Sequence, residues 1–190
     1  MPDNTTLAGT GRGTLIVLDS DVDEVYAIGN SNTTTGTGVV IQDLQLDGNQ
    51  ATNSNDHDGI LLDNLKDSTV QNVWVYDFDY SGIYVYQSEN ITLFNITAND
   101  NDDAGIQIQD SILTKLSSST AHNNSGYGIA IDGNYNTVTD SNTYSNFDGI
   151  SIAGYENIIV NFSTSSNDNV GIHLRDSMYG TVTDSVTELN

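Results

Sequence analysis

The chain has 190 residues, of which 26 are acidic and 4 are basic, and its formal net charge is −22 at pH 7. This charge excludes nucleic acid and anionic membrane surfaces as partners, because both require clustered Lys and Arg. The chain has no cysteine and therefore no disulfide, and no apolar run approaches the roughly 20 residues that insert across a bilayer.

Two interpretations of the acidic composition remain open. Turns favour Asp and Asn, because these side chains accept local backbone hydrogen bonds. Alternatively, the protein comes from a halophilic source, where salt screens the self-repulsion and the charge keeps the protein soluble. Turn chemistry accounts for the Asp content but not for the scarcity of Lys.

The first 37 residues are the least regular part of the chain. Residues 7–18 predict a glycine-rich turn followed by a strand, residues 25–28 another strand, and residues 29–38 a loop. The polar segment 48–58 then predicts a protruding loop. It is either a functional loop, because solenoid insertions gather on the binding face, or a polar surface insertion that the fold tolerates and that has no function.

From residue 59 onward one phrase recurs, in which Gly-Ile is followed by an aliphatic residue two positions after the Ile. The six copies begin at Gly59, Gly82, Gly105, Gly128, Gly149 and Gly171, at intervals of 23, 23, 23, 21 and 22 residues. Alternation of this kind has the period of a strand and not of a helix. A fixed interval of this length predicts a solenoid with one supersecondary unit per repeat.

Two further columns keep the same period. The first comprises Ile41, Val70, Leu93, Leu116, Val138, Val160 and Val182, and the second, three residues later, comprises Leu44, Val73, Ile96, Ser119, Ser141, Ser163 and Ser185. We expect each strand to pair with its copy one repeat later, about 4.8 Å away. The sequence therefore predicts one all-β domain over residues 1–190, a parallel β-helix of about seven coils with 21–23 residues each.

Small polar residues separate these two columns. The positions between them are Asp43, Asn72, Asn95, Ser118, Asp140, Phe162 and Asp184, of which all but Phe162 are small and polar. Stacked side chains of this kind can hydrogen-bond along the solenoid, as Asn and Gln do in other stacked strands. We expect a polar ladder at this bend.

The opening of the chain resembles a known superfamily. Leu7-x-Gly9-x-Gly11 followed by a strand, and then residues 40–49, are similar to the start of many pectin-lyase-like right-handed parallel β-helix proteins. These include polysaccharide lyases, C5-epimerases, glycosidases and viral tailspikes, so the resemblance is specific for fold and poor for activity. Such proteins often carry caps or form trimers. We therefore expect a fragment, a homotrimer or a subunit capped by other chains, unless irregular ends serve as caps.

Two columns of the Gly-Ile strands are expected to point outward. They comprise Leu61, Tyr84, Gln107, Ala130, Ser151 and His173, and Asp63, Tyr86, Gln109, Asp132, Ala153 and Arg175. In the resembling superfamily this face binds oligosaccharide, which makes Asp63, Tyr84, Tyr86, Gln107, Gln109 and Asp132 candidate carbohydrate-binding residues. The alternative is an ordinary solvated sheet face whose tyrosines cover each other.

One local cluster contains both a possible general base and a cationic side chain. It comprises the candidate catalytic residues His173, Arg175 and Asp176. Asp110 and Asp132 on neighbouring coils are a candidate carboxylate pair for hydrolysis. The signatures of related enzymes are missing: the chain has neither the Asp-Pro-His-Glu of mannuronan epimerases nor the Gly-His-Gly of polygalacturonase-like enzymes. Enzymatic activity is therefore left open.

Acidic residues recur three positions before the glycines. Asp56, Asp79, Asp102 and Asp168 occupy these positions, with Asn146 in the same column. Calcium, which takes 6–8 oxygen ligands, would relieve the repulsion of stacked carboxylates. The alternative is screening by salt alone, and no other cofactor is expected.

Three functions are compatible with these patterns. The first is an extracellular or virion-surface module of tailspike or fibre type, from a halophilic source, that recognises cell-surface polysaccharide. The second is the core of a polysaccharide lyase, C5-epimerase or glycosidase. The third is a purely structural rod.

Overall fold

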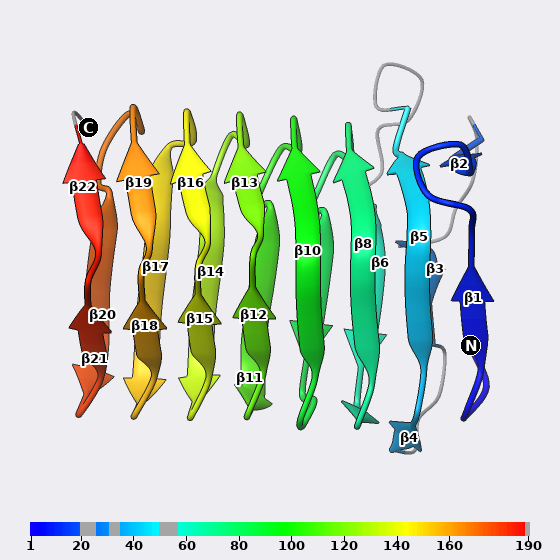
Figure 1. The fold of residues 1–190 in the computed structure, drawn as a ribbon, viewed down its shortest axis with the longest axis horizontal. Helices are drawn as coiled ribbons and strands as arrows, with labels where there is room; N and C mark the ends of the chain where they lie inside the picture. The colour runs from blue at the N-terminus through cyan, green and yellow to red at the C-terminus, as the bar shows by residue number, and fades with distance from the viewer. Residues whose placement is uncertain (20–25, 31–34, 50–56, 189–190) are drawn as a thin grey trace.

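The computed structural model describes residues 1–19, 26–30, 35–49 and 57–188. Within these residues every regular secondary-structure element is a β-strand, and the strands stack in parallel coils along one axis (Figure 1). The expected parallel β-solenoid is confirmed. No helix of the described residues is long and apolar enough to cross a lipid bilayer.

Three sheets run along the solenoid. The 13-stranded sheet contains β1 (Thr6–Ala8), β2 (Leu15–Val17), β5 (Val40–Asp47), β8 (Thr69–Tyr76), β10 (Thr92–Asn99), β12 (Lys115–Ser117), β13 (Thr120–His122), β15 (Thr137–Thr139), β16 (Asn142–Tyr144), β18 (Ile158–Val160), β19 (Ser163–Ser165), β21 (Thr181–Thr183) and β22 (Val186–Glu188). The seven-stranded sheet contains β3 (Tyr26–Gly29), β6 (Asp58–Asp63), β9 (Ile83–Tyr86), β11 (Ile106–Ile112), β14 (Tyr127–Asn134), β17 (Asp148–Tyr155) and β20 (Ile172–Met178). The third sheet pairs β4 (Gly36–Thr37) with β7 (Leu65–Lys66).

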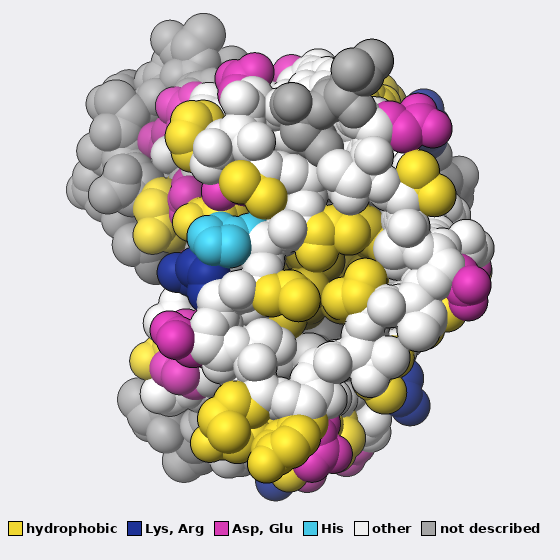
Figure 2. Space-filling view, turned by 90° about the vertical axis from the view of Figure 1, so that its left-hand side faces the viewer, with side chains coloured by type: hydrophobic (Ala, Val, Ile, Leu, Met, Phe, Trp, Pro, Cys, Tyr) yellow, Lys and Arg dark blue, Asp and Glu magenta, His cyan; other side chains and the backbone are white. Residues whose placement is uncertain are grey.

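The isoleucines of the Gly-Ile phrase form one stacked column in the core. Ile60, Ile83, Ile106, Ile129, Ile150 and Ile172 are register partners from β6 to β20. The preceding glycine is required by close approach: a Cβ on Gly105 would lie 2.8 Å from the carbonyl oxygen of Gly128. Viewed end-on, hydrophobic side chains fill the centre of the coil (Figure 2).

The predicted register is wrong in one coil. Val138 pairs with Ile159, and Ile159 pairs with Val182, so Val160 does not belong to the inward column. The core position expected for Ser163 is taken by Phe162, which is buried and whose backbone N–H donates to Ser185 Oγ at 3.2 Å. A slip of one residue turns every side chain to the opposite face, and the observed register buries an aromatic ring instead of exposing it.

The polar ladder at the bend is confirmed, with Asn161 in the place predicted for Phe162. Asp43, Asn72, Asn95, Ser118, Asp140, Asn161 and Asp184 all have φ between 50° and 58°, a conformation that Asn and Asp tolerate better than most residues. Asn72 Nδ2 donates to Asp43 Oδ1 at 2.8 Å and Asn95 Nδ2 to Asn72 Oδ1 at 2.8 Å. The side chains therefore compensate for the strained backbone that they occupy.

A second ladder lies inside the coil and was not predicted. Asn101, Asn124, Asn146 and Asn167 are buried, and the side-chain amide of each of the first three donates to the side-chain carbonyl oxygen of the next asparagine at 2.9–3.1 Å. Asn146 therefore belongs to this ladder and not to the acidic column, because the shorter coil displaces it by one position. A buried amide requires such partners, since an unsatisfied polar group in the core is costly.

The segment expected as a protruding loop lies mostly outside the described residues. Residues 50–56 are among those that the structure does not describe. At the end of this segment, His57 is buried and Asp58 begins β6, so both belong to the stacked coil.

Candidate functional site

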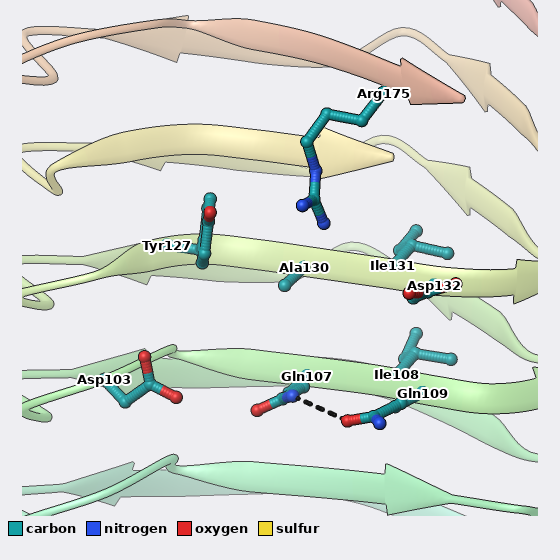
Figure 3. A pocket seen from close by; sticks show the side chains of 9 residues that line it. All are labelled: Asp103, Gln107, Ile108, Gln109, Tyr127, Ala130, Ile131, Asp132 and Arg175. Carbon is teal, nitrogen blue, oxygen red and sulfur yellow. Dashed lines mark hydrogen bonds between the residues drawn. The ribbon is translucent and has the colours of Figure 1, made fainter. Parts of the chain in front are cut away.

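A hollow of about 190 Å³ lies on the outer face of the seven-stranded sheet, over β11 and β14 (Figure 3). It is lined by Asp103, Gln107, Ile108, Gln109, Tyr127, Ala130, Ile131, Asp132 and Arg175. Gln107, Gln109, Asp132 and Arg175 are among the residues that the sequence analysis singled out.

The outward columns of the Gly-Ile strands are in the predicted register. Leu61, Tyr84, Gln107, Ala130, Ser151 and His173 are consecutive partners, as are Asp63, Tyr86, Gln109, Asp132 and Ala153. Asp63, Tyr84 and Tyr86 therefore lie on the same face, beside the residues that line the hollow.

Hydrogen bonds hold the polar side chains of this face in fixed orientations. Tyr84 Oη donates to Gln109 Oε1 at 2.9 Å, and Gln107 Nε2 donates to the same oxygen at 3.2 Å. Ser81 Oγ lies 3.2 Å from Gln107 Oε1 and 3.5 Å from Asp103 Oδ2. This network orients both glutamines without involving the Gln109 amide nitrogen, which donates to no residue in the described part of the chain.

Two tyrosines extend the face beyond the hollow. The ring centroids of Tyr84 and Tyr86 are 5.6 Å apart with an interplanar angle of 38°. Burial and the nearby Tyr86 raise the pKa of Tyr84 to about 12, so its hydroxyl remains a hydrogen-bond donor at neutral pH. The pair offers apolar ring surface next to the amides of Gln107 and Gln109.

Arg175 reaches the hollow from β20, across β17. The pairing of β17 with β20 shifts between Ile152 and Gly154, where Arg175 and Asp176 together lie opposite Ala153. The Arg175 side chain extends back over β17 towards Ala130 (Figure 3), and its Nε donates to Ser151 Oγ at 3.0 Å. The guanidinium is thereby held above the amide and carboxylate groups of β11 and β14.

The hollow includes one of the three residues of the predicted catalytic cluster. Arg175 lines the hollow, whereas His173 and Asp176 do not. His173 is the register partner of Ser151, and Asp176 has a φ of 45° at the bulge. The carboxylates that share the hollow with Arg175 are Asp103 and Asp132.

Sequence reasoning missed Ser81, Asp103 and Tyr127. Ser81 and Tyr127 directly precede the glycine of their phrases, and Asp103 precedes its glycine by two positions. The period was a sufficient signal for Tyr127, because its register partner Asp148 also stands directly before the glycine of a Gly-Ile phrase. The prediction began each strand at the glycine and so omitted the residues before it.

A buried carboxyl group lies behind Ser81. Asp58 is 6% exposed, and its Oδ1 accepts a hydrogen bond from the backbone N–H of Ser81 at 3.1 Å. Burial, with smaller contributions from the charges of Asp103 and Asp79, raises the pKa of Asp58 from its usual 3.8 to about 7, against the opposing Ser81 N–H. Burial also raises the pKa of Asp103.

The candidate calcium ligands do not converge in the described residues. Asp79 is 3.3 Å from Nδ1 of the buried His57, whose backbone N–H it also accepts at 2.6 Å. Asp102 Oδ1 is 3.5 Å from Ser125 Oγ, and Asp56 lies outside the described part of the chain. Across that part, no group of three or more His, Cys, Asp or Glu side chains is placed to hold a metal ion.

The coil geometry and the polar outer face define a parallel β-solenoid protein. Residues 3–162 match the family described as "Right handed beta helix region", and the chain belongs to that family. The right-handed parallel β-helix fold implied by the resemblance to pectin-lyase-like proteins is confirmed. A comparison with curated protein sequences finds no significant match.

Solved structures share the fold at low sequence identity. A pectate lyase, Pel9A, is 18% identical with a TM-score of 0.61, over 83% of this chain and 46% of that one. ORF18 of Geobacillus virus E2 is 16% identical with a TM-score of 0.65, over 97% and 48%. The Azotobacter vinelandii mannuronan C-5 epimerase A-module is 14% identical with a TM-score of 0.52, over 100% and 80%. This chain thus spans about half of the length of the first two.

Proposed function

We propose that this protein is an extracellular or virion-surface module that recognises polysaccharide through the outer face of the seven-stranded sheet. The observation that carries the proposal is the hollow in which Gln107 and Gln109 are held by hydrogen bonds beside Tyr84 and beneath Arg175. Amides and a guanidinium bind sugar hydroxyls and carboxylates, while tyrosine rings pack on the apolar faces of sugar rings.

Proteins with the same fold support this ligand class. They include a pectate lyase, an alginate lyase, a GH87 α-1,3-glucanase in complex with tetrasaccharides, and a tailspike protein of bacteriophage CBA120. The chain has 26 acidic residues and 4 basic ones, and this excess of acidic residues supports a saline source.

We expect Arg175→Ala to weaken polysaccharide binding at least tenfold, because it removes charge-assisted hydrogen bonds of about 1.5–3 kcal/mol. Affinity electrophoresis with polygalacturonate, alginate and α-1,3-glucan, repeated by calorimetry in molar NaCl, measures this change. Lys66→Ala removes the same charge far from the hollow and should leave binding unchanged. Equal affinities of the two variants, or no binding of the wild-type protein to any polymer tested, would contradict the proposal.

A second candidate is an enzyme that cleaves polysaccharide. The observation that favours it is that Asp103, whose pKa burial raises, shares the hollow with Asp132 and Arg175. A carboxyl group with a raised pKa and an ionised one can divide the roles of acid and base. Ultraviolet absorbance of unsaturated sugar ends detects a lyase, and released reducing ends detect a hydrolase. Activity that survives in both Asp103→Asn and Arg175→Ala rules out this site.

A further inference from the structure

A second hollow, of about 160 Å³, lies on the outer face of the 13-stranded sheet, beside the loop that joins β1 to β2 (right-hand end of Figure 1). The side chains that line it include Arg12 from this loop, Asn72 and Trp74 from β8, and Asn95 and Thr97 from β10. The polysaccharide site proposed above lies on the seven-stranded sheet and gives this hollow no role. The two hollows share no lining residue.

Hydrogen bonds fix the loop that carries Arg12. The backbone N–H of Gly11 donates to Asp43 O at 2.8 Å, and that of Thr14 donates to Gly11 O at 3.0 Å. The side-chain amide of Gln45 donates to the backbone carbonyl of Arg12 itself. The loop therefore holds Arg12 at a defined place over the sheet.

Trp74 positions the guanidinium of Arg12. The guanidinium carbon lies over the Trp74 ring, 4.4 Å from its centroid, in a cation–π contact. Trp74 is held in turn, because its indole N–H donates to Asn99 Oδ1 and its ring lies 5.1 Å from that of Tyr76. The guanidinium forms no hydrogen bond or ion pair with the described residues, so its N–H donors are available to a ligand.

The charge of this hollow is opposite to that of the chain. The formal net charge of the chain is −22, whereas Arg12 is the only charged side chain among the residues that line the hollow. The first hollow differs, because Asp103 and Asp132 accompany Arg175 there. An anionic group therefore meets less repulsion in the second hollow, and a guanidinium binds carboxylates through charge-assisted hydrogen bonds.

Neutral polar groups lie beside the guanidinium. Asn95 Nδ2 donates to Asn72 Oδ1 at 2.8 Å. Among the described residues, none donates to Asn95 Oδ1 and none forms a hydrogen bond with Thr97 Oγ1. An acceptor and a hydroxyl therefore remain open to the hydroxyl groups of a sugar.

From these observations we infer that the second hollow is a further carbohydrate site, which binds a sugar unit that bears a carboxylate, such as a uronate. Arg12 binds the carboxylate, and Asn95 and Thr97 bind neighbouring hydroxyl groups. The choice of a carboxylate depends on Arg12 and on a lining that contains no acidic side chain. The choice of a sugar rests on the proposed function, but binding at the two hollows can be measured separately.

Nuclear magnetic resonance separates this site from the first hollow. The chain has one tryptophan, Trp74, and two arginines, Arg12 and Arg175. In an Arg175→Ala background, therefore, one indole N–H signal and one arginine Nε–H signal remain, and both belong to the second hollow. We expect trigalacturonate to shift both signals saturably in a titration to about 10 mM, which covers the weak affinity of so small a site. The titration is run at the lowest NaCl concentration at which the protein stays folded, because salt screens the attraction.

Two ligands and two variants complete the test. Neutral galactotriose, which lacks carboxylates, and triglutamate, which lacks sugar rings, should each bind at least about tenfold more weakly than trigalacturonate. Arg12→Gln should weaken trigalacturonate binding, followed at the Trp74 indole, at least about tenfold. Lys115→Gln removes an equal charge from an exposed position of β12 outside both hollows and should leave the affinity unchanged.

The absence of a saturable shift with trigalacturonate, or equal losses in the two variants, overturns the inference. An equal affinity for galactotriose overturns the role of the carboxylate, and an equal affinity for triglutamate overturns the assignment to a sugar. None of these outcomes bears on the proposed function, because the Arg175→Ala background disables the first hollow.

Discussion

The free energy of unfolding of this protein is expected to decrease as the pH rises from about 4 to 7, and Asp58→Asn is expected to remove most of that decrease. Burial raises the pKa of Asp58 from 3.8 to about 7. Between these values the folded chain holds a proton that the unfolded chain has released. Stability therefore falls with rising pH until the folded carboxyl ionises near pH 7, and then levels off.

The expected size of this effect is about 4 kcal/mol, from roughly 1.4 kcal/mol for each of about three pKa units. Asparagine retains the oxygen that accepts the Ser81 N–H and removes the buried charge, so the variant should be more stable than the wild type at pH 8 and similar at pH 4. Urea unfolding at both pH values, followed by circular dichroism, measures the difference. Asp132→Asn, at an exposed position of the same face, is the control. A wild-type stability that is constant or rises between pH 4 and 7 would show that Asp58 is not buried as the structure places it.

Asn146→Ala is expected to destabilise the protein by about 3–5 kcal/mol. The side-chain oxygen Oδ1 of Asn146 accepts hydrogen bonds from the backbone N–H and the side-chain amide of Asn124, at 3.0 and 2.9 Å. The side-chain amide Nδ2 of Asn146 donates to Ala121 O and Asn167 Oδ1, both at 3.1 Å. Alanine removes all four bonds and leaves buried groups on both neighbouring coils without partners. Each such group costs about 1–3 kcal/mol, and the neighbouring coils can relax in part.

Chemical denaturation at a fixed pH measures this loss. Asn142→Ala is the matched control, because Asn142 lies in the same coil but outside the core, and its side chain accepts one bond, from Thr120 Oγ1 at 2.8 Å. We expect the control to cost about 1 kcal/mol. A loss at Asn146 no larger than that of the control would mean that the inner ladder contributes little to stability.

Much of the candidate site could be predicted from the spacing of the glycines. The Gly-Ile period placed Tyr84, Gln107 and Ala130 in one outward column, and the register confirms it. The period was sufficient because parallel coils pair residue for residue, so a position in sequence becomes a position on the face. The period failed at the coil containing Phe162. The repeat is shorter there, so the apolar residues fit two registers that turn opposite sets of side chains inward. Burial of the Phe162 ring shows which register the chain adopts.

The sequence alone determined the stacked parallel coils and the residues of their polar outer face, because a strict period leaves a chain this short few other ways to bury its isoleucines. The tertiary structure decided how those side chains act together. The Arg175 side chain reaches over β17 into the hollow, where its Nε donates to Ser151 Oγ, and burial of Asp58 raises the pKa of its carboxyl group to about 7. These features depend on desolvation and on contacts between coils, which no spacing in the sequence encodes.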